Sequence, residues 1–114
     1  MEKQSTKGVV LSFIDALNTE NFEEARKYIA DDLSFVGAMG TRQGGDTYIN
    51  DMKGLLLKYN ISKTFVEEDD VCLIYNIRFR NLNEPIYSCG LYRLENGKIK
   101  SIRVVFDPRP LLQR

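Results

Sequence analysis

The fold is decided by residues 71–106, which read VCLIYNIRFR NLNEPIYSCG LYRLENGKIK SIRVVF. Apolar and polar side chains alternate along much of this stretch, and a period of two residues is typical of a β-strand with one buried face. Turn-forming residues interrupt the alternation near residues 81 and 96. Together with the residues just before it, the stretch predicts an antiparallel meander of four long strands, at about 60–67, 71–80, 86–94 and 98–106.

The last turn of the meander, at Asn96-Gly97, allows two geometries. One is a two-residue hairpin, and the other is a three-residue loop with Gly97 left-handed in a bulge. We prefer the bulge, because it gathers the apolar side chains of the last two strands on one face of the sheet. The residues expected on that face are Ile86, Ser88, Gly90, Tyr92, Ile102, Val104 and Phe106.

The first half of the chain predicts three helices. Apolar residues from Val9 to Leu17 recur at steps of three and four, with Ser5 or Thr6 as the cap. Asn21 and Glu24 resemble a capping box, which predicts a short second helix. A strand at 33–36 and a flexible glycine-rich loop at 37–45 follow, and the third helix is expected to start at a cap on Asp46.

The composition indicates one globular domain over residues 1–114, because 43% of the residues are hydrophobic and 28% are charged. Histidine is absent from the sequence. This removes the usual general base, the Ser-His and Cys-His nucleophile pairs and most catalytic zinc sites. The four acids at 67–70 could hold a cation or form a solvated hairpin tip, and we prefer the tip. We expect no metal and no cofactor.

The two cysteines, Cys72 and Cys89, are too few for a disulfide framework. A loop at 81–84 would set Cys89 opposite Asn76 and Cys72 opposite Arg93, which separates the sulfurs too far for a bridge. No apolar run is long enough to span a bilayer, and the first residues lack the layout of a signal peptide. We therefore expect a cytoplasmic protein with no membrane partner.

The order of elements resembles the nuclear transport factor 2-like superfamily, and within it the SnoaL-like branch. The resemblance covers nearly the whole chain and includes ALNTEN at 16–21, YIADD at 28–32 and IRVVFDP at 102–108. It implies an α+β fold in which three N-terminal helices pack on a strongly curved, mainly antiparallel sheet, forming a cystatin-like cone with an internal pocket. It also implies a homodimer through the outer sheet face, but no particular activity.

Members of this superfamily that act as enzymes use groups that are largely missing here. Ketosteroid isomerase-like members use a tyrosine, a carboxylate base and a carboxylic acid. At these three positions, in that order, the chain has Phe13, Val36 or Gly37, and Cys89 or Gly90. The SnoaL-type cyclases need a histidine. The epoxide hydrolase type needs an Asp-Arg-Asp network on the sheet. Asp107, at the edge of the sheet, is the one aspartate expected on a matching strand face. Asp107 is therefore the one candidate acid or base, although an aspartate before proline commonly accepts backbone hydrogen bonds in a turn.

The resemblance and the predicted strand faces together define a ligand pocket. Its lining is expected to be apolar, with three phenols and one hydroxyl, which suits a small flat hydrophobic molecule. An enzyme acting on such a ring compound (an isomerase, cyclase or hydrolase) and a pure interaction module with a filled core are the alternatives. The expected lining is Phe13, Leu17, Phe35, Met39, Tyr48, Met52, Tyr75, Ser88, Tyr92, Val104 and Phe106.

The outer face of the sheet is expected to be too apolar to lie bare in solution, which favours the homodimer. An RNA-binding platform is the alternative, because the segment 71–114 has eight basic and three acidic residues. Tyr87 is the only aromatic residue expected among the arginines of this face, and one ring is meagre for base stacking. We therefore expect no nucleic-acid partner.

Overall fold

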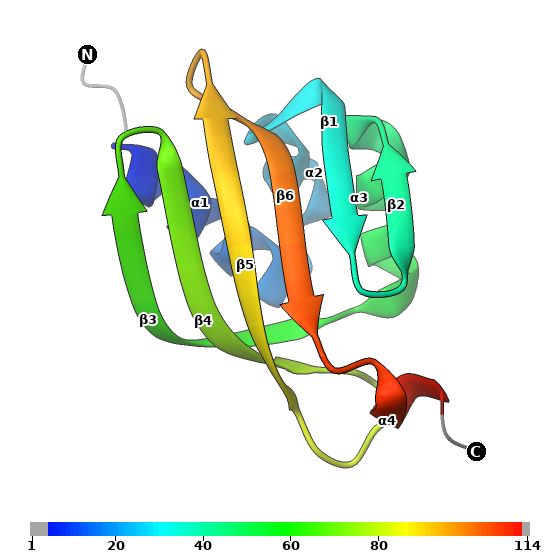
Figure 1. The fold of residues 1–114 in the computed structure, drawn as a ribbon. Helices are drawn as coiled ribbons and strands as arrows, with labels where there is room; N and C mark the ends of the chain where they lie inside the picture. The colour runs from blue at the N-terminus through cyan, green and yellow to red at the C-terminus, as the bar shows by residue number, and fades with distance from the viewer. Residues whose placement is uncertain (1–4, 113–114) are drawn as a thin grey trace.

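The protein has an α+β fold in which three helices cover one face of a six-stranded sheet (Figure 1). The structure is a computed structural model that describes residues 5–112. Its strands lie in the order β2-β1-β6-β5-β4-β3, and every neighbouring pair is antiparallel except β1 and β6. The elements are α1 (Thr6–Asn18), α2 (Phe22–Lys27), β1 (Ile29–Gly37), β2 (Gly40–Gln43), α3 (Gly45–Leu55), β3 (Lys58–Glu67), β4 (Asp70–Arg78), β5 (Ile86–Glu95), β6 (Lys98–Phe106) and α4 (Arg109–Leu112). The fold class and the four-stranded meander are confirmed.

The caps of the first two helices are those the sequence predicts. The Ser5 hydroxyl accepts a hydrogen bond of 2.9 Å from the backbone N–H of Gly8, and the Asn21 side chain accepts one of 3.2 Å from Glu24. Each bond satisfies a backbone donor that has no partner within its helix. The apolar face of α1 is buried against the sheet, with Phe13 fully buried.

The region between α2 and α3 is more ordered than the predicted flexible loop. Its first strand begins at Ile29, where Ile29 pairs with Ile99 in β6, and the glycine-rich segment forms the hairpin partner β2. The polar pair Asp31-Asp32 hides the start of this strand in the sequence. The predicted cap on Asp46 is also wrong, because the N-cap of α3 is Gly44, two residues earlier, and the helix itself begins at Gly45.

The N-cap of α3 is set by backbone geometry. Gly44 has a φ of 102°, which favours glycine, and its N–H donates to the carbonyl of Leu33 over 2.7 Å. The carboxylate of Asp46 instead accepts a hydrogen bond of 2.7 Å from Arg26 of α2. A fourth, short helix, α4, follows Pro108 and was not predicted.

The last turn is a two-residue Asn96-Gly97 hairpin, so the predicted bulge at the turn is wrong. Both residues have positive φ, 54° and 81°, and Glu95 pairs directly with Lys98. The extra residue lies further along β6, at Lys100, where the register shifts. Because this shift restores the alternation, the predicted faces of the last two strands are confirmed: Tyr92 lies opposite Ile102, and Gly90 lies opposite Val104.

The register of β4 and β5 differs from the prediction by two residues. Cys89 lies opposite Ile74, and Cys72 lies opposite Leu91. The connection is longer than residues 81–84, because the ladder already ends at the pair Ile77–Ile86. The two sulfurs, which we expected to be far apart, are 3.4 Å apart.

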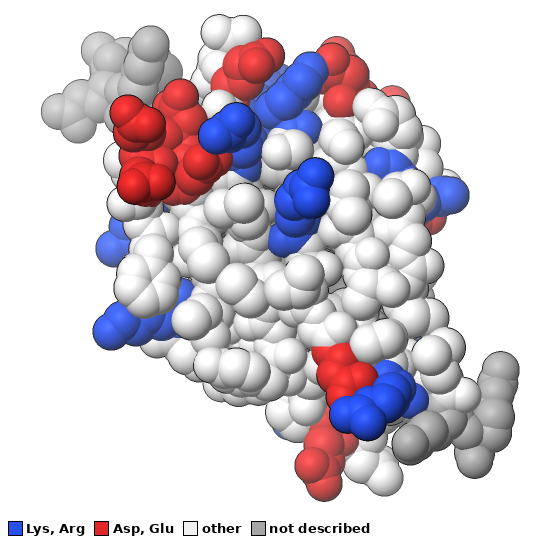
Figure 2. Space-filling model, in the orientation of Figure 1, with Lys and Arg blue, Asp and Glu red and all other residues white. Residues whose placement is uncertain are grey.

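The outer face of the sheet, seen in Figure 2, is mostly uncharged, with one basic side chain in its upper middle and the other charged side chains nearer its margins. Large apolar side chains on this face are well exposed, with Tyr87 68% and Val105 65% accessible. Among the described residues, no helix has the length and apolar character to cross a membrane. The hydrophobic core lies on the other face, under the three N-terminal helices.

Candidate functional site

A pocket of about 880 Å³ lies between α3, the hairpin of β1 and β2, and the nearby ends of β3, β4 and β6. The side chains of Met39 and Leu55 line it and are 56% and 44% exposed, so the pocket opens to solvent beside them. The rest of its wall is mainly apolar and aromatic. The larger side chains of this wall are Phe35, Tyr48, Met52, Leu57, Tyr59, Ile77, Phe79, Val104 and Phe106.

The structure brings six of the eleven predicted lining residues to this pocket. They are Phe35, Met39, Tyr48, Met52, Val104 and Phe106. The other five, Phe13, Leu17, Tyr75, Ser88 and Tyr92, are buried in the interior and do not line it. The hollow thus lies at one end of the sheet, and the part of the interior under α1 is filled by side chains.

The filled part of the interior is held by a pair of phenols. The hydroxyls of Tyr75 and Tyr92 are 2.7 Å apart and hydrogen-bond to each other. Tyr75 passes over Gly90, where an added Cβ would lie 2.2 Å from the Tyr75 hydroxyl. The hydroxyl of Ser88 donates to the backbone carbonyl of Ile86 over 3.0 Å. These polar groups are satisfied within the protein and need neither water nor a ligand.

Sequence reasoning missed several pocket residues. Ile77 follows Tyr75 on the buried face of β4, and Phe79, just beyond the end of that strand, continues an alternation that was visible in the sequence. Tyr59 lies one residue before the predicted start of its strand, so its side chain was given no face. Its place in the wall depends on a contact from α1.

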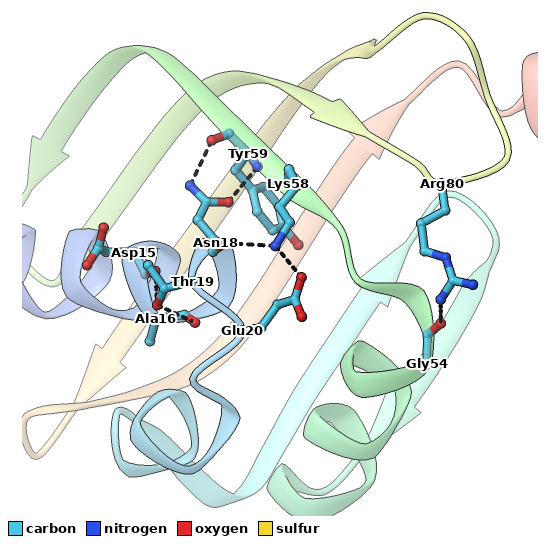
Figure 3. Close-up of polar contacts among 9 residues, drawn as sticks. All are labelled: Asp15, Ala16, Asn18, Thr19, Glu20, Gly54, Lys58, Tyr59 and Arg80. Atoms are coloured by element: carbon cyan, nitrogen blue, oxygen red, sulfur yellow. Dashed lines mark hydrogen bonds and ion pairs between the residues drawn. The ribbon is translucent and has the colours of Figure 1, made fainter.

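Asn18, the last residue of α1, fixes the start of β3 (Figure 3). Its side-chain amide donates to the carbonyl of Tyr59 over 2.9 Å, and its side-chain oxygen accepts from the N–H of Tyr59 over 2.7 Å. Lys58 then donates to the backbone carbonyl of Asn18 over 2.8 Å and to Glu20 over 2.7 Å. A cation at the C-terminal end of a helix is also favourable to the helix dipole. These contacts hold the Tyr59 backbone, and with it the ring, at the pocket wall.

The phenols of Tyr48 and Tyr59 are the hydroxyl groups of the aromatic wall, and the two interact with each other. Burial raises the pKa of both above the ordinary value for tyrosine. Both groups are therefore neutral hydrogen-bond donors at physiological pH. For Tyr59, the other polar neighbour is the Met52 sulfur, at 4.0 Å, which is a weak acceptor.

Two charged residues, Arg42 and Asp51, are found among the described side chains that line the pocket. They form an ion pair in which the guanidinium of Arg42 donates to the Asp51 carboxylate over 2.7 and 3.2 Å. Both side chains are partly exposed. Because their charges offset each other, the pocket presents no net charge to a guest.

The candidate catalytic residue Asp107 does not line this pocket. It is exposed, and its carboxylate accepts hydrogen bonds from the side chain of Arg109 over 2.6 to 2.9 Å and from the backbone N–H of the same residue over 3.0 Å. The Arg109 guanidinium holds the pKa of Asp107 below its usual range. The position matches an aspartate that stabilises the turn into α4.

A model of the SnoaL-like domain family matches residues 10–102. A crystal structure of an NTF2-like protein of unknown function from Cytophaga hutchinsonii is 47% identical, with a TM-score of 0.94, covering 99% of this chain and 100% of that one. An LEH-like epoxide hydrolase from M. tuberculosis is 19% identical, with a TM-score of 0.80 and coverage of 91% and 84%. An uncharacterized cystatin-fold protein from Novosphingobium aromaticivorans is 16% identical, with a TM-score of 0.79 and coverage of 89% and 97%. No curated protein matches.

Proposed function

The chain belongs to the SnoaL-like family of the NTF2-like superfamily, and we propose that it binds a small, uncharged, hydrophobic ring molecule in the pocket beside α3. The observation that carries this proposal is the mainly apolar pocket of about 880 Å³. Sites for small molecules commonly have volumes of roughly 300 to 1,000 Å³ and are lined by apolar and aromatic side chains. The aromatic rings of the wall favour a flat guest.

The two phenols of the wall indicate one further property of the guest. The hydroxyl proton of Tyr59 has only a weak acceptor nearby, the sulfur of Met52 at 4.0 Å. A carbonyl or ether oxygen on the guest would accept it far better. We therefore expect a ring compound that carries a neutral hydrogen-bond acceptor.

Catalysis on such a molecule, as an isomerase, cyclase or hydrolase, is a weaker proposal. Tyr48 and Tyr59 are poor general bases, because their raised pKa keeps both phenols protonated. Asp51, the one carboxylate in the described lining, is engaged by Arg42. Binding without turnover needs none of these groups to exchange a proton. An interaction module with a filled core is disfavoured by the pocket itself.

Binding is tested with N-phenyl-1-naphthylamine, an uncharged probe whose fluorescence rises in an apolar site. We expect saturable enhancement with the wild-type protein. Met39→Trp places a bulky ring at the exposed rim and should weaken the probe's affinity by about tenfold or more. Val66→Trp is the matched control, because Val66 is also exposed but lies outside the pocket, at the far end of β3. Equal binding by both variants, or no saturation, would contradict the proposal.

We further propose that the protein is a cytoplasmic homodimer that pairs through the outer sheet face. The support is the exposed apolar surface around Tyr87, Leu91 and Val105. Size-exclusion chromatography should give a dimer that Val105→Asp dissociates and Val66→Asp leaves intact. A wild-type monomer at micromolar concentration would overturn this part of the proposal.

A further inference from the structure

Cys72 and Cys89 form a close pair of thiols on the outer face of the sheet. They lie on the neighbouring strands β4 and β5, and their sulfur atoms are 3.4 Å apart. Since Cys72 is opposite Leu91 and Cys89 is opposite Ile74, the two cysteines occupy diagonal positions on one face. Both side chains are partly exposed, and both thiols are free.

We propose that Cys72 and Cys89 are a reversible dithiol site, which forms an intramolecular disulfide by exchange with a low-molecular-weight disulfide such as oxidised glutathione. One cysteine thiolate attacks the glutathione disulfide, giving a mixed disulfide and one glutathione thiolate. The second cysteine loses its proton and attacks the protein sulfur of the mixed disulfide, releasing the second glutathione. The two cysteines are thereby oxidised and oxidised glutathione is reduced to two molecules of glutathione, which take up the two thiol protons.

The geometry favours closure within one chain. A disulfide bond is about 2.05 Å long, so the sulfurs must approach by about 1.4 Å from their separation of 3.4 Å. Diagonal positions on neighbouring strands lie roughly 7 to 8 Å apart, so closure combines rotation about the Cα–Cβ bonds with a small approach of the two strands. The sequence has no third cysteine that could compete within the chain. The second step is therefore local, and mixed adducts should be short-lived.

The surroundings of the pair set the conditions for the reaction. Desolvation raises the pKa of the Cys72 thiol, so the exchange should accelerate as the pH rises.

The site is on the sheet face opposite the core, and neither cysteine lines the ligand pocket. Its behaviour is therefore independent of ligand binding. Neighbouring residues Ile74 and Val105 belong to the face proposed to pair, so a second copy would shield the thiols from the oxidant.

The reduced protein is incubated with oxidised glutathione at the lowest concentration at which intact-mass spectrometry detects it, where a dimer is least populated. We expect the wild type to lose two hydrogens in mass, without a lasting glutathione adduct, and to regain them with dithiothreitol. Cys72→Ser and Cys89→Ser should instead each accumulate one glutathione adduct. Peptide mapping of the wild type, which does not depend on the variants folding, should find residues 72 and 89 joined within one chain.

Three results would overturn the inference. They are glutathione adducts that persist on the wild type, disulfides that join two chains, and native protein that stays reduced at every concentration while the unfolded protein reacts. The ligand-binding proposal would survive each of them, because it rests on the opposite face of the sheet.

Discussion

The side-chain amide of Asn18 makes both backbone hydrogen bonds of Tyr59, donating to its carbonyl over 2.9 Å and accepting from its N–H over 2.7 Å. The first residues of β3 otherwise lie at the edge of the sheet, where one row of backbone groups has no strand to pair with. One polar side chain at the end of α1 therefore connects the helical layer to the wall of the pocket.

Replacing Asn18 with alanine should destabilise the protein by about 1 to 3 kcal/mol, because two backbone groups of Tyr59 lose their partner at a partly buried position. Urea denaturation followed by circular dichroism measures the change. Asn60→Ala is the matched control, since Asn60 is an exposed asparagine next to Tyr59, and its effect should stay within about 0.5 kcal/mol. Equal effects of the two substitutions would show that the Asn18 contact does not stabilise the fold.

Two glycine substitutions should have opposite signs. At Gly90, an added Cβ would lie 2.2 Å from the Tyr75 hydroxyl and 2.8 Å from the Tyr92 ring, so Gly90→Ala should destabilise by about 1 to 3 kcal/mol or more. At Gly54, in the exposed last turn of α3, no atom lies within 4 Å of the added carbon apart from the adjacent residues and the backbone of its own helix. Gly54→Ala should therefore stabilise by up to about 1 kcal/mol. Thermal unfolding of both variants tests the pair, and a tolerated Gly90→Ala contradicts the close packing.

Alkaline pH should unfold the protein through its buried phenols. Burial raises the pKa of Tyr48, Tyr59, Tyr75 and Tyr92 above that of an unfolded tyrosine. Their contribution to stability is therefore fully present below pH ~10 and is lost as the pH rises beyond it. Tyrosinate absorbance should show these phenols ionising together with the loss of circular dichroism. Ionisation of all six tyrosines near pH ~10 in a still folded protein would refute the burial.

Removing one hydroxyl should distinguish guests with and without a hydrogen-bond acceptor. Tyr59→Phe should weaken the binding of 2-acetonaphthone by roughly fivefold to tenfold, since about 1 kcal/mol of hydrogen bonding is lost. Naphthalene, which has no acceptor, should bind the variant and the wild type equally. Tyr87→Phe, on the exposed outer face, should change neither affinity. Isothermal titration calorimetry measures all of these values, and an equal loss for both guests would argue against a donor role for Tyr59.

The layered fold could be predicted from the sequence because its signals are local. The apolar face of α1, the Ser5 and Asn21 caps and the alternation along the meander all depend on residues close in sequence. The strand β1 was underestimated because its pairing partner, β6, is about seventy residues away. A local pattern gives no sign of such a distant parallel partner. In addition, the polar residues Asp31 and Asp32 hide the start of the strand.

The pocket could be predicted only in part, because inward-facing side chains do not reveal where the space between them is empty. Phe13 and Tyr92 do face inward, yet they pack against each other with their ring centroids 6.5 Å apart. Tyr59 was missed because its position depends on Asn18, forty-one residues earlier. The distance between Cys72 and Cys89 was misjudged because it depends on the register of β4 and β5, which the length of the loop between them sets. The alternation of apolar and polar residues does not reveal where such a loop begins and ends.

The most direct test of a ligand pocket beside α3 is a titration with 2-acetonaphthone, followed through the methyl signals of selectively labelled protein by nuclear magnetic resonance. We predict saturable shifts of Met39, Met52, Leu57, Ile77 and Val104, with Ile74, Leu91 and Val105 unmoved on the other face. Shifts confined to the outer face, or no saturable shift at the pocket methyls, would contradict it.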